Sequence, residues 1–139
     1  MPFFSKAVLF LAGAISVGIG AAVLIIPEAF FAYNGIVLHQ DPSLLSEVRA
    51  PGGTLLVLGV FMLAGVFRSG LATAARNIAA AVFLSYGFAR ILSVAVDGTP
   101  DEKLVIAAVF EIGIGLLCIL PVPLRRKVEP SAAAALAPR

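Results

Sequence analysis

The sequence predicts an all-α integral membrane protein in which four apolar helices pack as a bundle. Composition carries much of this prediction, because 60% of the 139 residues are hydrophobic and only 13% are charged, whereas soluble domains carry about 25% charged residues. The mean hydropathy of +1.05 agrees. Charged residues also divide the chain into four apolar runs, each close to the roughly 20 residues that a helix needs to cross the hydrocarbon core. A soluble core of this size could not bury so much apolar surface, so the excess is expected to face lipid.

The four predicted spans follow from where charged residues stop and resume. They cover about residues 7–26, 51–67, 74–96 and 104–120. The first run could instead be a cleaved signal peptide, but its apolar stretch is longer than a usual signal core and no Ala-x-Ala site precedes Pro27. We therefore expect this run to be retained as a span.

The C-terminal residues differ in composition from the spans. Pro121 and Pro123 are helix stop signals, and residues 125–139 begin with basic residues and continue rich in alanine and proline. The expected organisation is one transmembrane domain at residues 1–124 followed by a cytoplasmic tail at residues 125–139.

Positive charge predicts the orientation in the membrane, because cytoplasmic flanks retain lysine and arginine. Most basic residues lie on the side of the two termini and the loop between the second and third spans, and most acidic residues lie on the opposite side. Both termini are therefore expected to be cytoplasmic. The basic residues on that side are Lys6, Arg68, Arg76, Arg125, Arg126, Lys127 and Arg139.

Two loop segments carry helix-starting signals. Thr99-Pro100-Asp101-Glu102 is a capping box at the start of the fourth span, so Asp101 and Glu102 need no catalytic role. Asp41-Pro42 is expected to start a short helix on the membrane surface, which ends where Pro51-Gly52-Gly53 bends the chain into the second span. The fold prediction therefore includes a short interfacial helix before that span.

Small residues predict close packing between the spans. Gly13, Ser16 and Gly20 share one face of the first span, and Gly115 and Cys118 share a face of the fourth with Ala108 and Glu111. In lipid, small side chains let helices approach closely, so that van der Waals contact holds them together. A tight bundle is the expected result, with a pore or lipid groove as the alternative.

Ionisable residues inside the spans are the strongest signal of a site, because charge at bilayer depth is normally paired or functional. Arg90 lies on the third span and Glu111 on the fourth. A short loop makes these spans antiparallel neighbours, and the two residues lie nearly equally far from it. We therefore predict that Arg90 and Glu111 form an ion pair.

Other polar residues are expected to join this pair in the outer half of the bundle. Tyr86, Ser93 and Asp97 lie at helical spacing from Arg90 on one face of the third span. The same counting across the loop between the second and third spans places Thr54 at the depth of Arg90 and Glu47 at the depth of Asp97. The predicted polar cluster is Glu47, Arg49, Thr54, Tyr86, Arg90, Ser93, Asp97 and Glu111. These residues either bind a ligand or handle protons, or they only hold the bundle together.

Three segments carry a resemblance to a known family: SEVRAPGG before the second span, GFARILSVAVDG closing the third, and VFEIGIG within the fourth. They resemble small bacterial four-span membrane proteins of a domain-of-unknown-function family, similar in layout to DoxX-like proteins. The resemblance covers about residues 27–120 and implies architecture only, without an activity. We expect the protein to lie in the inner membrane. The family pattern would fall on Glu47, Arg49, Gly52, Gly53, Arg90, Asp97, Gly98 and Glu111.

Three classes of function remain open. The favoured class is a binding or accessory protein in the lipid bilayer that holds a small amphipathic molecule, such as a lipid, quinone or steroid, or stabilises a larger membrane complex. The second is a proton-coupled carrier that uses Glu111, which would need to form a homo-oligomer. The third is an intramembrane enzyme.

Missing motifs argue against several chemistries. The sequence has no HExxH motif, no phosphate-binding loop, a single cysteine and a single histidine, so no cofactor or metal centre is expected. Ser93 has no histidine to activate it, which ranks the enzyme last. The basic residues are dispersed, so no nucleic acid partner is expected.

Overall fold

The computed structural model describes residues 1–120, and these residues are almost entirely helical. The helices are α1 (Phe3–Ile25), α2 (Pro27–Tyr33), α3 (Pro42–Phe67), the short 3-10 helix η1 (Ser69–Leu71), α4 (Ala72–Asp97) and α5 (Glu102–Ile119). The all-α prediction is confirmed for this part of the chain. The predicted tail at residues 125–139 and the domain boundary at residue 124 lie outside the described residues.

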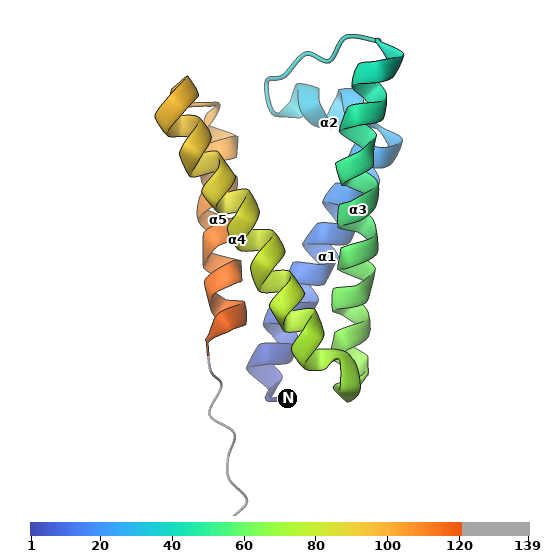
Figure 1. Cartoon of the computed structure of the whole chain (residues 1–139), viewed down its shortest axis with the longest axis vertical. Coiled ribbons are helices and arrows are strands. Elements are labelled where there is room, and N and C mark those ends of the chain that lie inside the picture. The colour runs from blue at the N-terminus through green and yellow to red at the C-terminus, as the bar shows by residue number, and fades with distance from the viewer. Residues whose placement is uncertain (121–139) are drawn as a thin grey trace, which may run out of the picture.

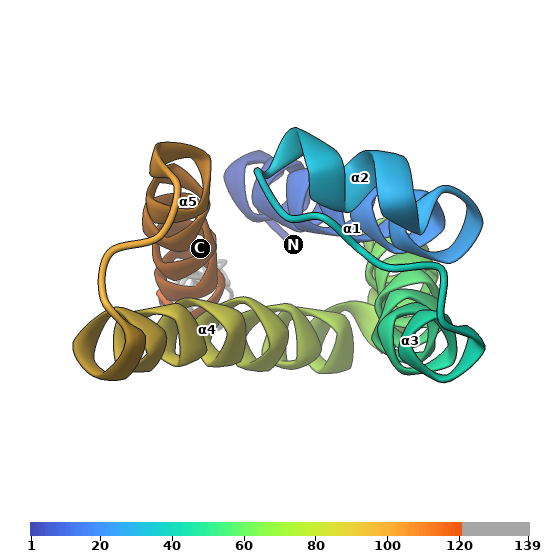
Figure 2. The ribbon, with the colours of Figure 1, turned by 90° about the horizontal axis from the view of Figure 1, so that it is seen from above.

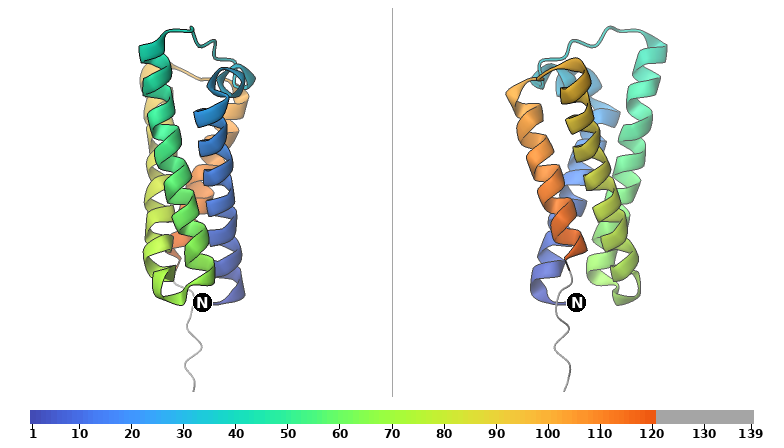
Figure 3. Two further views of the ribbon diagram at one scale, coloured as in Figure 1. Left: turned by 90° about the vertical axis from the view of Figure 1, so that its right-hand side faces the viewer. Right: turned by 60° about the vertical axis from the view of Figure 1, so that its left-hand side comes forward.

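The long helices form two antiparallel pairs, α1 with α3 and α4 with α5 (Figure 1). The N-terminus and the turn between α3 and α4 lie at one end, which we call the N-terminal end (Figure 3). Helix α2 lies across the opposite end, beside the turn between α4 and α5 (Figures 1 and 2). We call this opposite end the α2 end. The two pairs diverge toward it (Figure 1).

Three helices within residues 1–120 are long and apolar enough to cross a membrane: α1, α3, and η1 continued by α4. This finding indicates a membrane protein. Helix α5 is not among these helices. Its 18 residues include three charged ones, Glu102, Lys103 and Glu111. The fourth predicted span is therefore present as a helix, but its length and composition alone do not identify it as a span.

The predicted bend at Pro51 is wrong, because α3 runs unbroken from Pro42 to Phe67. The segment expected to be a separate interfacial helix is the first part of α3, whose N-cap Asp41 accepts a 2.8 Å hydrogen bond from the Leu44 amide. Proline has a φ angle compatible with a helix and loses only one hydrogen bond there. Packing against α1 holds the turn in place, since Gly52 touches Val23 of α1 closely: a Cβ on Gly52 would lie 2.8 Å from Val23 Cγ1.

Helix α2 was not predicted, although the sequence carries its starting signals. Pro27 occupies the first helical position, and Glu28 lies in the first turn, where a carboxylate favours the positive end of the helix dipole. The seven residues are too few to show a helical period of apolar side chains. The sequence pattern therefore predicts no helix in this segment.

Glycines bring α1 and α3 into backbone contact, as the small-residue face of α1 predicted. A Cβ added at Gly20 would lie 2.8 Å from the carbonyl oxygen of Gly52, and one added at Gly59 would lie 3.0 Å from that of Gly13. Ser16 is buried between them and lies 3.7 Å from the sulfur of Met62. Such contacts maximise dispersion attraction between helices in lipid.

The dense core occupies the part of the bundle near the N-terminal end. Its residues come from all four long helices and are mostly small or unbranched, so that the helices meet at short distances. They are Val8, Leu9, Ala12, Met62, Ala75, Ala79, Ala80, Phe83, Ile114 and Cys118.

Candidate ligand-binding cavity

A cavity of about 790 Å³ lies between the two helix pairs, beyond the dense core and toward the α2 end. All five α-helices contribute to its lining, and most of the lining side chains are apolar. The polar side chains that reach it are Ser16, Tyr33, Asn34, Glu47, Tyr86, Arg90, Ser93 and Glu111. An apolar cavity with a few convergent polar groups is the usual form of a small-molecule site.

Helix α2 lies across the α2 end of the bundle (Figure 2), and side chains of this helix and of Asn34 line the cavity there. Phe30 and Phe31 line it with their rings edge to face, 5.7 Å apart at the centroids. Asn34 caps this short helix by donating a 2.9 Å hydrogen bond from Nδ2 to the Phe30 carbonyl. Both rings are therefore part of the cavity lining at this end.

Lys103 connects α2 to the first turn of α5. Its Nζ donates a 2.6 Å hydrogen bond to the carbonyl of Tyr33 and lies 4.5 Å from the centroid of the Tyr33 ring. The ammonium group therefore makes both a charge-assisted hydrogen bond and a cation–π contact. These two contacts connect α2 to the α4–α5 pair.

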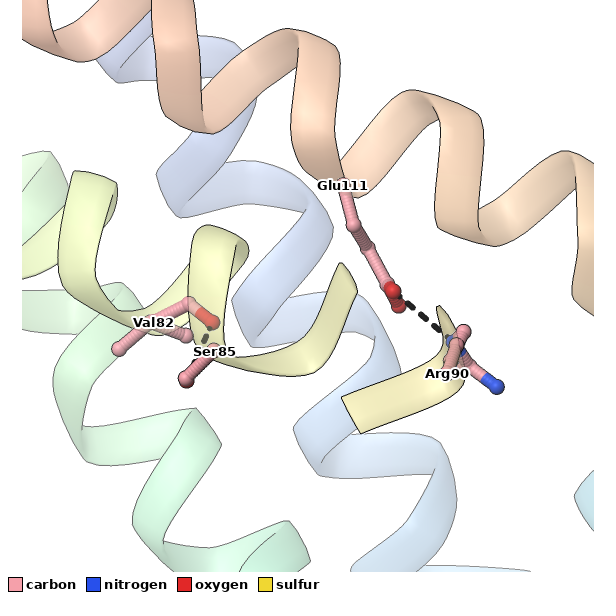
Figure 4. A network of polar contacts seen from close by, with 4 residues as sticks. All are labelled: Val82, Ser85, Arg90 and Glu111. Atoms are coloured by element: carbon pink, nitrogen blue, oxygen red, sulfur yellow. Dashed lines mark hydrogen bonds and ion pairs between the residues drawn. The ribbon is translucent and has the colours of Figure 1, made fainter. Parts of the chain in front are cut away.

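Arg90 and Glu111 meet at the wall of the cavity, as the depth argument predicted (Figure 4). The Nε of Arg90 donates to Oε2 of Glu111 at 2.8 Å. The two side chains are 31% and 14% exposed, respectively. Within residues 1–120 the other two guanidinium nitrogens make no hydrogen bond, so they can donate to a molecule in the cavity. Ser85, also drawn in Figure 4, turns away and bonds the Val82 carbonyl of its own helix at 2.9 Å.

Three more of the predicted residues line the same cavity. Tyr86 and Ser93 reach it from α4, and Glu47 reaches it from α3. Ser93 donates a 3.0 Å hydrogen bond to Oδ2 of Asp97, which is exposed and does not line the cavity. The structure therefore brings Glu47, Tyr86, Arg90, Ser93 and Glu111 to one space, with Asp97 attached through Ser93.

Arg49 and Thr54 are not part of this group. They line a separate surface hollow of about 510 Å³ together with Leu24 at the end of α1, and Thr54 donates its hydroxyl to the Ala50 carbonyl at 3.2 Å. Depth along a helix says nothing about rotation around its axis, and successive residues point about 100° apart. Glu47 and Arg49 therefore face different sides of α3 although their depths are similar.

Arg76 has a structural role that its assignment to a cytoplasmic flank did not reveal. From the first turns of α4 it donates to the carbonyls of Cys118 and Leu120, at 2.8 and 3.0 Å. These carbonyls end α5 and have no partner within the helix, and a cation also suits the negative end of the helix dipole. A basic residue near the end of a neighbouring helix is the only sequence signal for this cap.

The described residues offer no cluster for a metal ion: among residues 1–120, no three His, Cys, Asp or Glu side chains gather closely enough. The polar groups of the cavity are instead two carboxylates, one guanidinium, hydroxyls and an amide. This set can exchange hydrogen bonds and charge with a bound organic molecule.

The comparisons with known proteins identify a family but no activity. A family model described as Domain of unknown function (DUF4345) matches residues 4–121. The search of curated proteins and the search of solved structures find no match. The matched region includes all of the five α-helices except Phe3, the first residue of α1, and every residue of the cavity. The chain therefore belongs to the family defined by this domain of unknown function, as the resemblance of its motifs implied.

Proposed function

We propose that this protein is a four-span membrane protein that binds a small amphipathic molecule in the cavity between its helix pairs. The observation that carries the proposal is the cavity itself, whose volume of about 790 Å³ lies within the range of roughly 300 to 1,000 Å³ that ligand sites occupy. Its apolar walls suit a hydrocarbon or ring system. Its polar side chains, gathered around Arg90 and Glu111, suit one polar end.

The proposal takes α5 as the fourth span. Its 18 residues reach about 27 Å at 1.5 Å per residue, slightly less than the roughly 30 Å of a hydrocarbon core. Its charges are compatible with this position, because Glu102 and Lys103 lie at its end and Glu111 pairs with Arg90. Arg76 satisfies carbonyls at its other end. Four spans would leave both termini on one side, which the distribution of basic residues makes the cytoplasmic side of the inner membrane.

A purely structural role for the Arg90–Glu111 pair explains less of what is observed. A pair that only held α4 to α5 would not need to border a cavity, and its remaining guanidinium nitrogens would be expected to bond other protein groups. Here Arg90 lines the cavity, and within residues 1–120 its only hydrogen bond is the one from Nε to Glu111. The pair is therefore proposed to hold the helices together and also to contact the ligand.

A proton-coupled carrier is the second candidate, because Glu111 is a largely buried carboxylate that borders the cavity. If so, proteoliposomes should take up a substrate in response to a pH gradient, and Glu111→Gln should abolish that response while binding persists. Binding without gradient-driven uptake would exclude the carrier and support only the first proposal, a binding protein.

The topology can be tested with single cysteines in a Cys118→Ala background. Thr99→Cys, in the turn between α4 and α5, should react in intact cells with a membrane-impermeant thiol reagent. Ser131→Cys should react only after the cells are opened. The reverse pattern would overturn the proposed orientation, and labelling of both positions in intact cells would show that α5 does not cross the membrane.

Ligand binding can be tested in nanodiscs of phosphatidylcholine with a dodecanol that carries a photoreactive diazirine. Labelling should be saturable, should map to cavity-lining peptides, and should be displaced by unlabelled dodecanol. Ala89→Phe places a ring in the cavity wall and should reduce labelling several-fold. Ala81→Phe, on the same helix but outside the cavity, is the matched control and should not. Labelling that is unsaturable and spread over lipid-facing surfaces would refute the proposed function.

A further inference from the structure

We propose that the cavity selects amphiphiles whose polar end is a cation, such as a long-chain amine. This inference rests on the proposed function and names the class of ligand. It follows from two independent features of the lining, which are the balance of charge and the number of aromatic rings.

The cavity is lined by more negatively charged side chains than positively charged ones. Two carboxylates, Glu47 and Glu111, face one guanidinium, Arg90. Arg90 is joined to Glu111 by the 2.8 Å contact, and within residues 1–120 Glu47 has no ion-pair partner. A net negative charge therefore remains at the wall that α3 contributes. An anionic head group would meet this charge unfavourably, and a cationic one would neutralise it.

Within residues 1–120 no basic residue forms an ion pair with Glu47. Arg49 belongs to the separate hollow beside α1 and does not line the cavity. Lys103 is also outside the lining, and its ammonium group is held by the carbonyl and ring of Tyr33. The carboxylate of Glu47 is thus available to a ligand.

Aromatic rings are concentrated around the same space. The cavity is lined by both tyrosines and by four of the ten phenylalanines: Phe30, Phe31, Tyr33, Phe83, Tyr86 and Phe110. A cation is attracted to the face of an aromatic ring, and more strongly so when it is removed from water. The contact of Lys103 with Tyr33 demonstrates this kind of interaction at the edge of the site. Carboxylates and aromatic faces together favour an ammonium group over a neutral or anionic one.

The experiment compares three probes of equal chain length as competitors of the photoreactive dodecanol in uncharged nanodiscs. Dodecylamine is the cation, dodecanol the neutral reference and dodecanoate the anion, and each concentration is expressed as the mole fraction measured in the membrane. Dodecylamine should compete at about tenfold lower mole fraction than dodecanol, since tenfold corresponds to a gain of 1.4 kcal/mol, and dodecanoate should be the weakest.

Variants test whether Glu47 is the source of this preference. Glu47→Gln should bring the ratio of amine to alcohol potency close to one, and Glu47→Asp, which keeps the charge, should retain most of it. Glu102→Gln removes a carboxylate at the α2 end that does not line the cavity, and it should leave the ratio unchanged.

The results separate this inference from the proposed function. Saturable labelling that dodecanol displaces, with the amine no better or with dodecanoate the strongest, would overturn the cation preference and leave the binding site standing. An amine preference that survives Glu47→Gln would also overturn it, because the charge of Glu47 carries the argument. If no probe displaces the label from any variant, both the proposed function and this inference fail.

Discussion

The two halves of the helical domain differ in how closely the helix pairs pack against each other. Near the N-terminal end, residues from all four long helices meet in a dense core whose central members, such as Leu9 and Met62, are completely buried. Toward the α2 end the helix pairs diverge (Figure 1), and a cavity with aromatic, charged and hydroxyl groups on its wall lies between them. The polar and charged side chains on the cavity wall are not required for packing a membrane bundle.

This difference separates residues that pack closely against one another from residues that border the cavity. Dispersion contacts stabilise the packed half, since apolar side chains gain little from leaving one another for lipid. On the two sides of the cavity, α1 packs closely against α3, and α4 is joined to α5 by the Arg90–Glu111 pair. Substitutions in the two halves should therefore have unequal effects on stability.

The largest effect is expected at the seam between α1 and α3. Gly20→Leu places a side chain where even a Cβ would lie 2.5 Å from the Leu56 amide nitrogen, and backbone atoms cannot move aside as side-chain ends can. We expect little folded, monodisperse protein by size-exclusion chromatography in detergent. The control is Gly18→Leu on the same helix, where a Cβ meets open space. Equal behaviour of the two variants would show that this seam does not hold the fold.

The next largest effect is expected from shortening a side chain of α1, and its size should differ between the packed half and the cavity half. Leu9→Ala removes a completely buried side chain from the packed half and should lower the free energy of unfolding by about 2 to 5 kcal/mol. Ile19→Ala removes a side chain of similar size from the cavity wall, where few atoms lie opposite it, and should lower it by less than about 1 kcal/mol. Thermal unfolding in detergent measures both. Equal losses would mean that the cavity is filled or collapsed in the folded protein.

A smaller effect is expected at the charge pair that borders the cavity. Arg90→Met and Glu111→Gln should each lower stability by about 1.5 to 3 kcal/mol, the range for hydrogen bonds to charged groups. The double variant should recover part of the combined loss, because neither charge is then left without its partner. Additive losses in this cycle would show that the two side chains do not interact.

The smallest effect is expected where α4 caps α5. Arg76→Gln loses the charge and shortens the donor that reaches the carbonyls of Cys118 and Leu120, which should lower stability by about 1 to 2 kcal/mol. Hydrogen exchange of the last turn of α5 should increase, while exchange in α1 should be unchanged. Arg68→Gln, in an exposed residue next to the α3–α4 turn, is the control. Unchanged exchange in α5 would contradict the capping role.

The sequence by itself determined the helical class, most helix positions and the Arg90–Glu111 contact. Apolar runs of the length of a bilayer and short loops are local properties, and a short loop gives the relative depth of residues on the two helices that it joins. The small-residue face of α1 was visible for the same reason, because helical spacing places Gly13, Ser16 and Gly20 together.

Only the tertiary structure decided what depends on rotation and on packing between distant segments. Helical spacing could not tell that Arg49 and Thr54 face away from the cavity, because depth does not specify the side of a helix. Nor could local preference reveal that α3 continues through Pro51, since its contact with α1 outweighs the lost hydrogen bond. The cavity is likewise a property of how the two helix pairs diverge, which no single helix encodes.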